Sequence, residues 1–137
     1  MIEQQIDTLL ERVSQLLLQK QLHIATAESC TGGLISHMLT NISGSSAYYI
    51  CGIVSYSNRT KHQLLGVPNR TLDTYGAVSS QVAQAMAEGI RRLSSVDIGV
   101  ATTGIAGPTG GTKAKPVGLV YVGVASHSGT KVGAYQF

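Results

Sequence analysis

Two short polar stretches of the sequence combine residue types that could perform nucleophilic chemistry. The first is Glu28-Ser29-Cys30-Thr31, which follows an apolar run of strand length and leads through Gly32 and Gly33 into an apolar helical pattern. A turn from a strand into a helix holds side chains at the carboxyl end of a sheet and aims free helix N–H groups at whatever binds there. Ser29 is therefore a candidate nucleophile. The structural alternative is that Ser29 or Thr31 only caps the following helix.

The second stretch is Ser55-Tyr56-Ser57-Asn58, which is followed by Lys61. A serine is weakly nucleophilic and needs a nearby base. Lys61 lies one helical turn after Asn58, so it can point back over the end of the strand before it. A lysine with a pKa lowered by burial can act as that base, and a Ser–Lys pair is a known nucleophile–base pair. An exposed helix lysine is the structural alternative.

Two neighbours compete for these roles. His62 is a second candidate base, although it faces about 100° away from Lys61 on a helix. Cys30 is a second candidate nucleophile, because thiols are intrinsically more reactive than hydroxyls. Its structural alternative is a small buried apolar residue.

A third stretch, Thr102-Thr103 followed by a glycine-rich loop, is a candidate anion cradle. Its glycines are Gly104, Gly107, Gly110 and Gly111. Unhindered N–H groups can surround an anion, but the loop has neither the ending of a P-loop nor the spacing of a dinucleotide fingerprint. The alternative is a tight connection between strands. If the strands run parallel, all three stretches share one crevice outside their carboxyl ends.

Composition limits the classes of protein that fit. The 137 residues suit one domain with a single core. The net charge of +3 is scattered rather than gathered in the basic stripe expected for binding nucleic acid. The sequence shows no signal-peptide pattern and no apolar run of about 18 residues. Its two cysteines have no metal or disulfide spacing. We therefore expect a cytoplasmic protein with no metal, no membrane partner and no nucleic-acid partner.

The periodicity predicts alternating helices and strands, then a closing strand pair. We expect helices over about 4–20, 32–39, 58–65, 68–75 and from 79 or 80 to 93, with Asn58 as the cap of the third. Strands are expected over 22–27, 48–56, 98–103, 117–125 and 132–137. This order predicts an α/β fold with a mixed β-sheet and helices on both faces, a three-layer α/β/α sandwich.

The same stretches resemble a known family in order and spacing over nearly the whole chain. The matching segments are 27–33, Gly44-Ser45-Ser46, 54–58 with Lys61, 65–67, 76–79, 103–108 with Gly110-Gly111, and 115–118. They are similar to the C-terminal domain of the competence/damage-inducible protein CinA, which also occurs alone as nicotinamide-nucleotide amidohydrolase.

The resemblance implies hydrolysis of the amide of nicotinamide mononucleotide to nicotinic acid mononucleotide and ammonia, without metal or cofactor. It implies Ser29 as nucleophile and Lys61 as base, with Tyr56 assisting proton transfer or orienting Lys61. The expected partners are a small pyridine nucleotide and further copies of the chain in a homo-oligomer. The implied substrate-binding residues are Glu28, Cys30, Thr31, Gly32, Gly33, Ser46, Asn58, Thr103, Gly104, Gly107, Gly110 and Gly111.

One departure from the family concerns the end of the chain. Family members continue through a Gly-Asp-Arg-like segment into a last helix, whereas this sequence ends at Phe137. We therefore expect residues 1–137 to form a single domain without that helix. The alternative function is a catalytically inactive module that binds a nucleotide or a protein partner.

Overall fold

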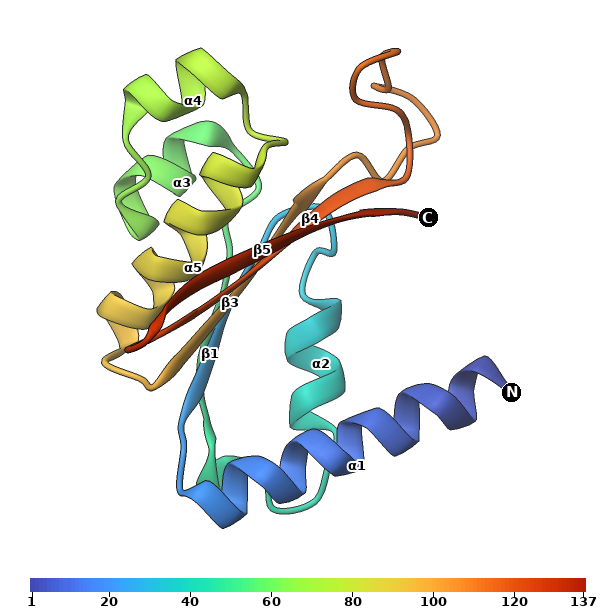
Figure 1. Ribbon diagram of the computed structural model, residues 1–137, viewed down its shortest axis with the longest axis vertical. Coiled ribbons are helices and arrows are strands. Elements are labelled where there is room, and N and C mark those ends of the chain that lie inside the picture. Colours follow the sequence, from blue (N-terminus) through green and yellow to red (C-terminus); the bar gives the residue numbers. More distant parts are fainter.

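The computed structural model describes residues 1–137 and is built on one mixed sheet of five strands (Figure 1). The strand order is β2-β1-β3-β4-β5. Strands β1, β2 and β3 are parallel, whereas β4 is antiparallel to both β3 and β5. Because the three parallel strands end at the same edge, the polar stretches that follow them meet there. The strands are β1 Ile24–Glu28, β2 Tyr49–Val54, β3 Ile98–Gly104, β4 Leu119–Ser126 and β5 Gly129–Gln136.

Helices lie in two groups on opposite sides of the sheet, as predicted (Figure 1). On one side lie α3, Asn58–Leu65, α4, Asn69–Tyr75, and α5, Ser80–Ser94. On the other side lie α1, Ile2–Lys20, and α2, Leu34–Thr40, and the short 3₁₀ turn η1, Ser45–Ala47, leads into β2. None of these helices combines the length and apolarity that a bilayer span requires.

The main core lies between the sheet and α5. Alternation along β1 turns Ala25 and Ala27 toward this side, where they pack with Met86 and Ile90 of α5. The sheet is also lined with glycine here: a Cβ at Gly123 would lie 2.8 Å from the backbone oxygen of Ala83. Small residues on the strands therefore let α5 lie close against the sheet and hold its position.

The second core lies between β1, α1 and α2. It gathers the buried side chains of Leu17, Ile24, Leu39 and Tyr48. This cluster is smaller than the one under α5, and Val124 on the outer half of this sheet face stays exposed.

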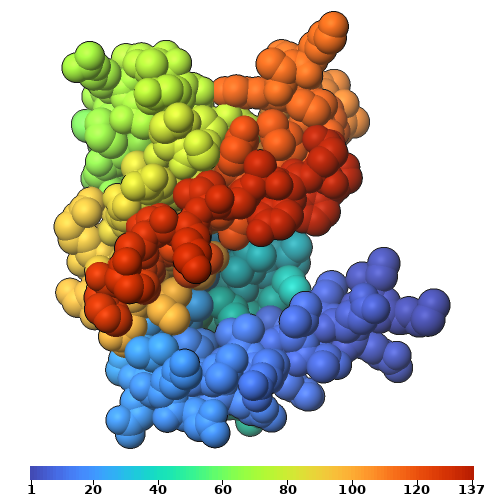
Figure 2. All heavy atoms as spheres, viewed as in Figure 1, coloured from blue at the N-terminus to red at the C-terminus, as the bar shows by residue number.

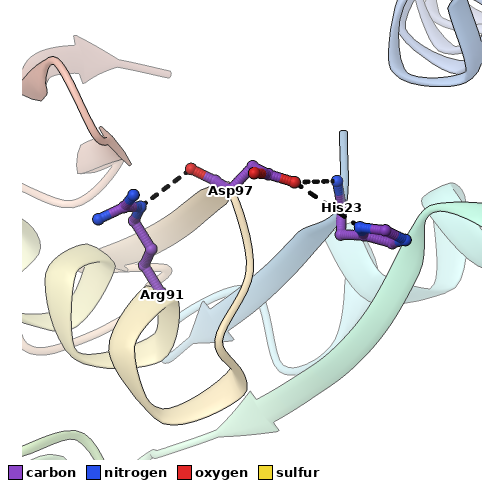
Figure 3. Close-up of polar contacts among 3 residues, drawn as sticks. All are labelled: His23, Arg91 and Asp97. Carbon is purple, nitrogen blue, oxygen red and sulfur yellow. Dashed lines mark hydrogen bonds and ion pairs between the residues drawn. The ribbon is translucent and has the colours of Figure 1, made fainter. Parts of the chain in front are cut away.

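Polar contacts fasten the amino ends of β1 and β3 (Figure 3). The backbone N–H of His23 donates to Asp97 Oδ2 over 2.8 Å, and Arg91 Nε donates to the Asp97 carbonyl over 2.9 Å. His23 Nδ1 lies 3.7 Å from the same carboxylate oxygen. These contacts hold the register that pairs Ile24 with Ile98, and so align the opposite, polar ends of the two strands.

The predicted elements are present, with corrections at their ends. Ser57 rather than Asn58 caps α3, because the Ser57 hydroxyl accepts the Thr60 N–H over 3.2 Å. The last strand begins at Gly129 instead of residue 132, because the hairpin turn is shorter than the predicted loop. The strand predicted over 48–56 ends at Val54, where the backbone turns toward α3.

Candidate active site

Ser29 is held at the carboxyl end of β1 by its neighbours on both sides. Its N–H donates to the carbonyl of Thr102 over 3.1 Å, and the N–H of Ser55 donates to the carbonyl of Glu28 over 2.8 Å. These bonds continue the ladders beyond the strands. The alternation of β1 then directs Ser29 to the α3 side and Glu28 to the α2 side.

Lys61 of α3 reaches Ser29 from that side and is buried, with 1% of its surface exposed. Its Nζ lies 2.9 Å from Ser29 Oγ, 2.9 Å from the carbonyl oxygen of Ser55 and 3.0 Å from the carbonyl oxygen of Tyr56. No carboxylate pairs with Lys61, since the single ion pair of the structure is that of His23 with Asp97. The number of these contacts equals the three hydrogen-bonding positions that a lysine nitrogen has besides its own carbon.

Burial lowers the pKa of Lys61 from its ordinary value of 10.5. The same three contacts suit an ammonium, which donates to all three oxygens, and a neutral amine. An amine has two N–H groups and one lone pair, and carbonyl oxygens only accept hydrogen bonds. As the ammonium, Nζ donates to Ser29 Oγ and to the carbonyls of Ser55 and Tyr56. As the neutral amine it would donate to the two carbonyls only, and its lone pair would face the Ser29 hydroxyl. This is the arrangement that a nucleophile and its general base require.

Ser29 and Lys61 line a pocket of about 200 Å³. Besides this pair its walls comprise Cys30, Tyr56, Ala77, Val78, Thr103, Gly104 and Ala106. The Tyr56 side chain lies at the rim and is mostly exposed, so its closest contact with Lys61 is through its backbone carbonyl. The lining is mixed: Ala77, Val78 and Ala106 supply apolar surface, and Ser29, Lys61 and Thr103 supply polar groups.

Cys30 shares this pocket but is the weaker candidate nucleophile. Burial raises the pKa of its thiol above the ordinary 9.0, and only the thiolate is strongly nucleophilic. His62, the rival base, bonds through Nδ1 to the carbonyl of Val67 over 2.8 Å. The structure brings Lys61, and not His62, to Ser29.

Glu28 is engaged within the fold on the opposite face of the sheet. Its Oε1 accepts from Thr31 Oγ1 at 2.6 Å and the Ile35 N–H at 2.9 Å, and its Oε2 accepts from the Ser36 N–H at 2.9 Å and Ser36 Oγ at 2.6 Å. Burial raises the pKa of Glu28, but the hydrogen bonds from Ser36, Thr31 and Ile35 together outweigh burial and lower it. Thr31 gives its only hydroxyl proton to this carboxylate, so Thr102 is the donor in its 2.8 Å contact with Thr31.

The turn after Ser29 offers N–H groups to a developing negative charge. The N–H of Gly32 donates to the carbonyl of Ser29, whereas those of Cys30 and Thr31 have no backbone acceptor. Gly33 adopts a φ of 108°, a conformation that favours glycine, where the chain enters α2. The Glu28 network fixes both ends of this turn.

The remaining predicted binding residues divide between the pocket, the loop and distant positions. Thr103 lies in the pocket wall, where its hydroxyl donates to the carbonyl of Ala77 over 2.8 Å. Gly107, Gly110 and Gly111 belong to the loop between β3 and β4 and do not line the pocket. Asn58 is exposed at the start of α3. Ser46 lies in η1, before β2 begins and therefore at the opposite end of that strand.

Comparison with known proteins identifies the family. The model of the CinA C-terminal domain matches residues 6–137. The chain belongs to the CinA C-terminal domain family. A Desulforudis audaxviator protein named as competence-damage inducible is 60% identical over 114 residues, which make up 83% of this chain and 28% of that protein. A CinA-like protein of Syntrophus aciditrophicus is 53% identical over 131 residues, or 96% of this chain and 31% of that one.

Solved structures share the CinA fold. The competence/damage inducible protein CihA of Agrobacterium tumefaciens superposes with a TM-score of 0.89 at 46% identity, covering 96% of this chain and 79% of that one. The chain spans about three-tenths of the curated relatives it matches. The family resemblance and the fold read from the sequence are thereby confirmed.

Sequence reasoning missed the groups of this CinA domain that act through the backbone. The carbonyls of Ser55 and Tyr56 orient Lys61, yet a carbonyl has no residue-type signature. Ala77 and Val78 form a pocket wall from the connection between α4 and α5. They lie in the segment 76–79 that matches the family, but an alanine and a valine carry no sign of a place in a pocket wall, which only the fold reveals.

Proposed function

We propose that the protein is an amidohydrolase that cleaves the carboxamide of nicotinamide mononucleotide with Ser29 as nucleophile and Lys61 as general base. The observation that carries the proposal is the 2.9 Å contact between Ser29 Oγ and the Nζ of a buried lysine whose two other contacts are carbonyl oxygens. In the neutral form of Lys61 the two carbonyls accept its N–H groups and the lone pair faces the hydroxyl proton of Ser29. Family membership supports the same assignment.

The reaction proceeds in two balanced stages. Lys61 accepts the hydroxyl proton while Ser29 Oγ bonds to the carboxamide carbon, and the N–H groups of Cys30 and Thr31 stabilise the oxyanion. Lys61 then returns the proton to the leaving nitrogen, which departs as ammonia and leaves an ester on Ser29. A water molecule attacks that ester while Lys61 takes its proton. Lys61 then gives the proton to Ser29 Oγ as the bond from this oxygen to the acyl carbon breaks, which releases the acid product and restores the free serine.

The pocket supports a primary amide on a flat ring. At about 200 Å³ it is smaller than the 300–1,000 Å³ typical of sites that enclose a drug-sized ligand. It therefore takes the pyridine carboxamide and leaves the ribose phosphate outside. The apolar walls from Ala77, Val78 and Ala106 fit the ring faces.

The test is ammonia release from nicotinamide mononucleotide by the wild type, Ser29→Ala and Lys61→Ala. Each substitution is expected to lower turnover about a thousandfold or more. Matched controls are Ser43→Ala and Lys20→Ala, both at exposed positions, and circular dichroism checks folding of every variant.

Near-wild-type rates in both site variants would exclude the dyad. No release by folded wild type, together with binding of the mononucleotide, would favour the nucleotide-binding module instead.

A further inference from the structure

The loop between β3 and β4 presents one lysine in a defined position. At its base the Ile105 N–H donates to Leu119 and the Gly118 N–H donates to Ile105, so the two arms extend the hairpin. At its tip the Thr112 N–H donates to the Lys115 carbonyl over 2.8 Å, and the Lys115 N–H donates to Thr112 Oγ1 over 3.0 Å. The turn therefore fixes the backbone from which the Lys115 side chain extends.

Lys115 bridges from this loop to the end of α4, two residues before the pocket wall at Ala77. Its Nζ donates to the carbonyl of Tyr75, the last residue of α4, over 2.6 Å. A Cβ at Gly76 would lie 3.0 Å from that Nζ, so the glycine keeps this place open. Figure 2 shows loop atoms, in orange, reaching the green and yellow-green helices across a hollow at the upper edge of the molecule.

The bridge lies beside the mouth of the pocket. Ala77, two residues after Tyr75, lines the pocket together with Val78. Two residues span at most about 7 Å of chain, so the ammonium is held within a short reach of the pocket wall. From the other side, Ala106 of the same loop also lines the pocket.

The charge of Lys115 is not neutralised by any carboxylate, because the single ion pair of the structure is between His23 and Asp97. An ammonium has three N–H donors, and only one of them has an acceptor here. Its present partner is a neutral carbonyl. A phosphate oxygen would bind it more strongly, because hydrogen bonds between charged partners are about twice as strong as those between neutral groups.

We propose that Lys115 determines specificity by binding the phosphate of the substrate, exchanging the Tyr75 carbonyl for a phosphate oxygen as the ligand fills the pocket. The ligand class is a carboxamide carrying a phosphate monoester one sugar away. This inference rests on the proposed amide hydrolysis for the position of the ring. In this proposal Lys115, rather than the glycines of the loop, selects phosphorylated over unphosphorylated substrates.

The test measures binding in the Ser29→Ala protein, which separates recognition from turnover. Isothermal titration calorimetry compares nicotinamide mononucleotide with the phosphate-free nucleoside. We expect the mononucleotide to bind about 10- to 100-fold more tightly, as one hydrogen bond between charged groups provides. Lys115→Gln should abolish most of that preference and Lys115→Arg should retain it. Lys113→Gln, which removes an exposed lysine two residues away, is the matched control and should keep the preference.

The nucleoside distinguishes recognition from damage to the loop. If Lys115→Gln only disordered the loop by freeing it from Tyr75, both ligands would weaken equally and the preference would persist, which overturns the inference. Equal binding of both ligands before substitution, or binding of neither, also overturns it. A Lys115-dependent preference without ammonia release by the wild type upholds the inference and refutes hydrolysis. Ammonia release by the wild type, together with a preference for the mononucleotide that does not depend on Lys115, upholds hydrolysis and refutes the inference.

Discussion

Glu28→Gln tests whether a buried carboxylate holds the turn that carries the nucleophile. Each oxygen of Glu28 accepts one backbone N–H and one hydroxyl. Glutamine replaces one oxygen with an NH₂ group. A hydroxyl can rotate to accept from that group, but the backbone N–H of Ile35 or Ser36 cannot. One buried N–H therefore loses its acceptor, and the bonds that remain lose their charge.

The expected cost follows from these bonds. An unsatisfied buried donor costs about 1–3 kcal/mol, and a hydrogen bond to a charged group contributes about 1.5–3 kcal/mol. We take about 3 kcal/mol for the sum. With an unfolding entropy of about 2.1 cal/mol/K per residue, 137 residues give about 0.29 kcal/mol/K. The melting temperature should therefore fall by about 10 °C.

The pH dependence adds a second readout. Because the folded pKa of Glu28 is lowered from its ordinary 4.5, its contribution is fully present above 4.5 and is lost as pH falls through the folded value. In the Glu28→Gln protein, the stability that the wild type loses at low pH through protonation of Glu28 should no longer depend on pH.

Urea unfolding between pH 3 and 7 measures the loss of about 3 kcal/mol and its pH dependence, and a thermal melt measures the fall in melting temperature. Glu11→Gln, on the exposed face of α1, is the control, and its stability is expected within about 0.5 kcal/mol of wild type. A Glu28→Gln protein as stable as that control, with an unchanged acid limb, would refute the reasoning.

Two further predictions concern the charge state of Lys61. Burial lowers the pKa of Lys61 below 10.5, so between the folded pKa and 10.5 the unfolded chain binds one more proton than the folded chain. The wild type should therefore gain stability as pH rises through that range. Urea unfolding at pH 6 and pH 9 should show that Lys61→Met lacks this gain, and an equal gain in both proteins would contradict the prediction. Ala106→Asp places a carboxylate on the exposed wall of the same pocket. The carboxylate should raise the pKa of Lys61 and move the rise of kcat/KM with pH to higher pH. Ala114→Asp, at the exposed loop tip, is the control. A pH profile that Ala106→Asp leaves unmoved would show that the rise of kcat/KM does not report the titration of Lys61.

The sequence was sufficient for the order of elements and for nominating Ser29 and Lys61, which the structure brings into contact. Helical periodicity and short β-branched runs are local properties, and the parallel strands bring their carboxyl ends together once the order is known. Ser29 and Lys61 could be nominated because a hydroxyl and an amine follow neighbouring strands. The burial of Lys61 could not be predicted, because an exposed helix lysine has the same sequence pattern.

The part of Glu28 was hidden for a different reason. The family resemblance implied that Glu28 contacts the substrate, but the alternation of β1 sends Glu28 and Ser29 to opposite faces. The donors to Glu28 include the backbone N–H groups of Ile35 and Ser36. A backbone N–H is the same in almost every residue, so the sequence could not predict these bonds. Ser46 shows the converse: its motif resembles the family, yet η1 lies at the far end of β2 from the pocket.

The separation of Glu28 from Lys61 bears on the proposed role of Lys61 as a base. A carboxylate facing Lys61 would pair with it, favour the ammonium and raise its pKa. The lowered pKa of Lys61 has burial as its cause, and no carboxylate contributes. One residue of register decides this, because a shift by one position along β1 would exchange the faces of Glu28 and Ser29. The contacts of His23 and Asp97 at the amino ends of the strands, and the ladder bonds at their carboxyl ends, therefore hold the register that keeps Glu28 away from Lys61.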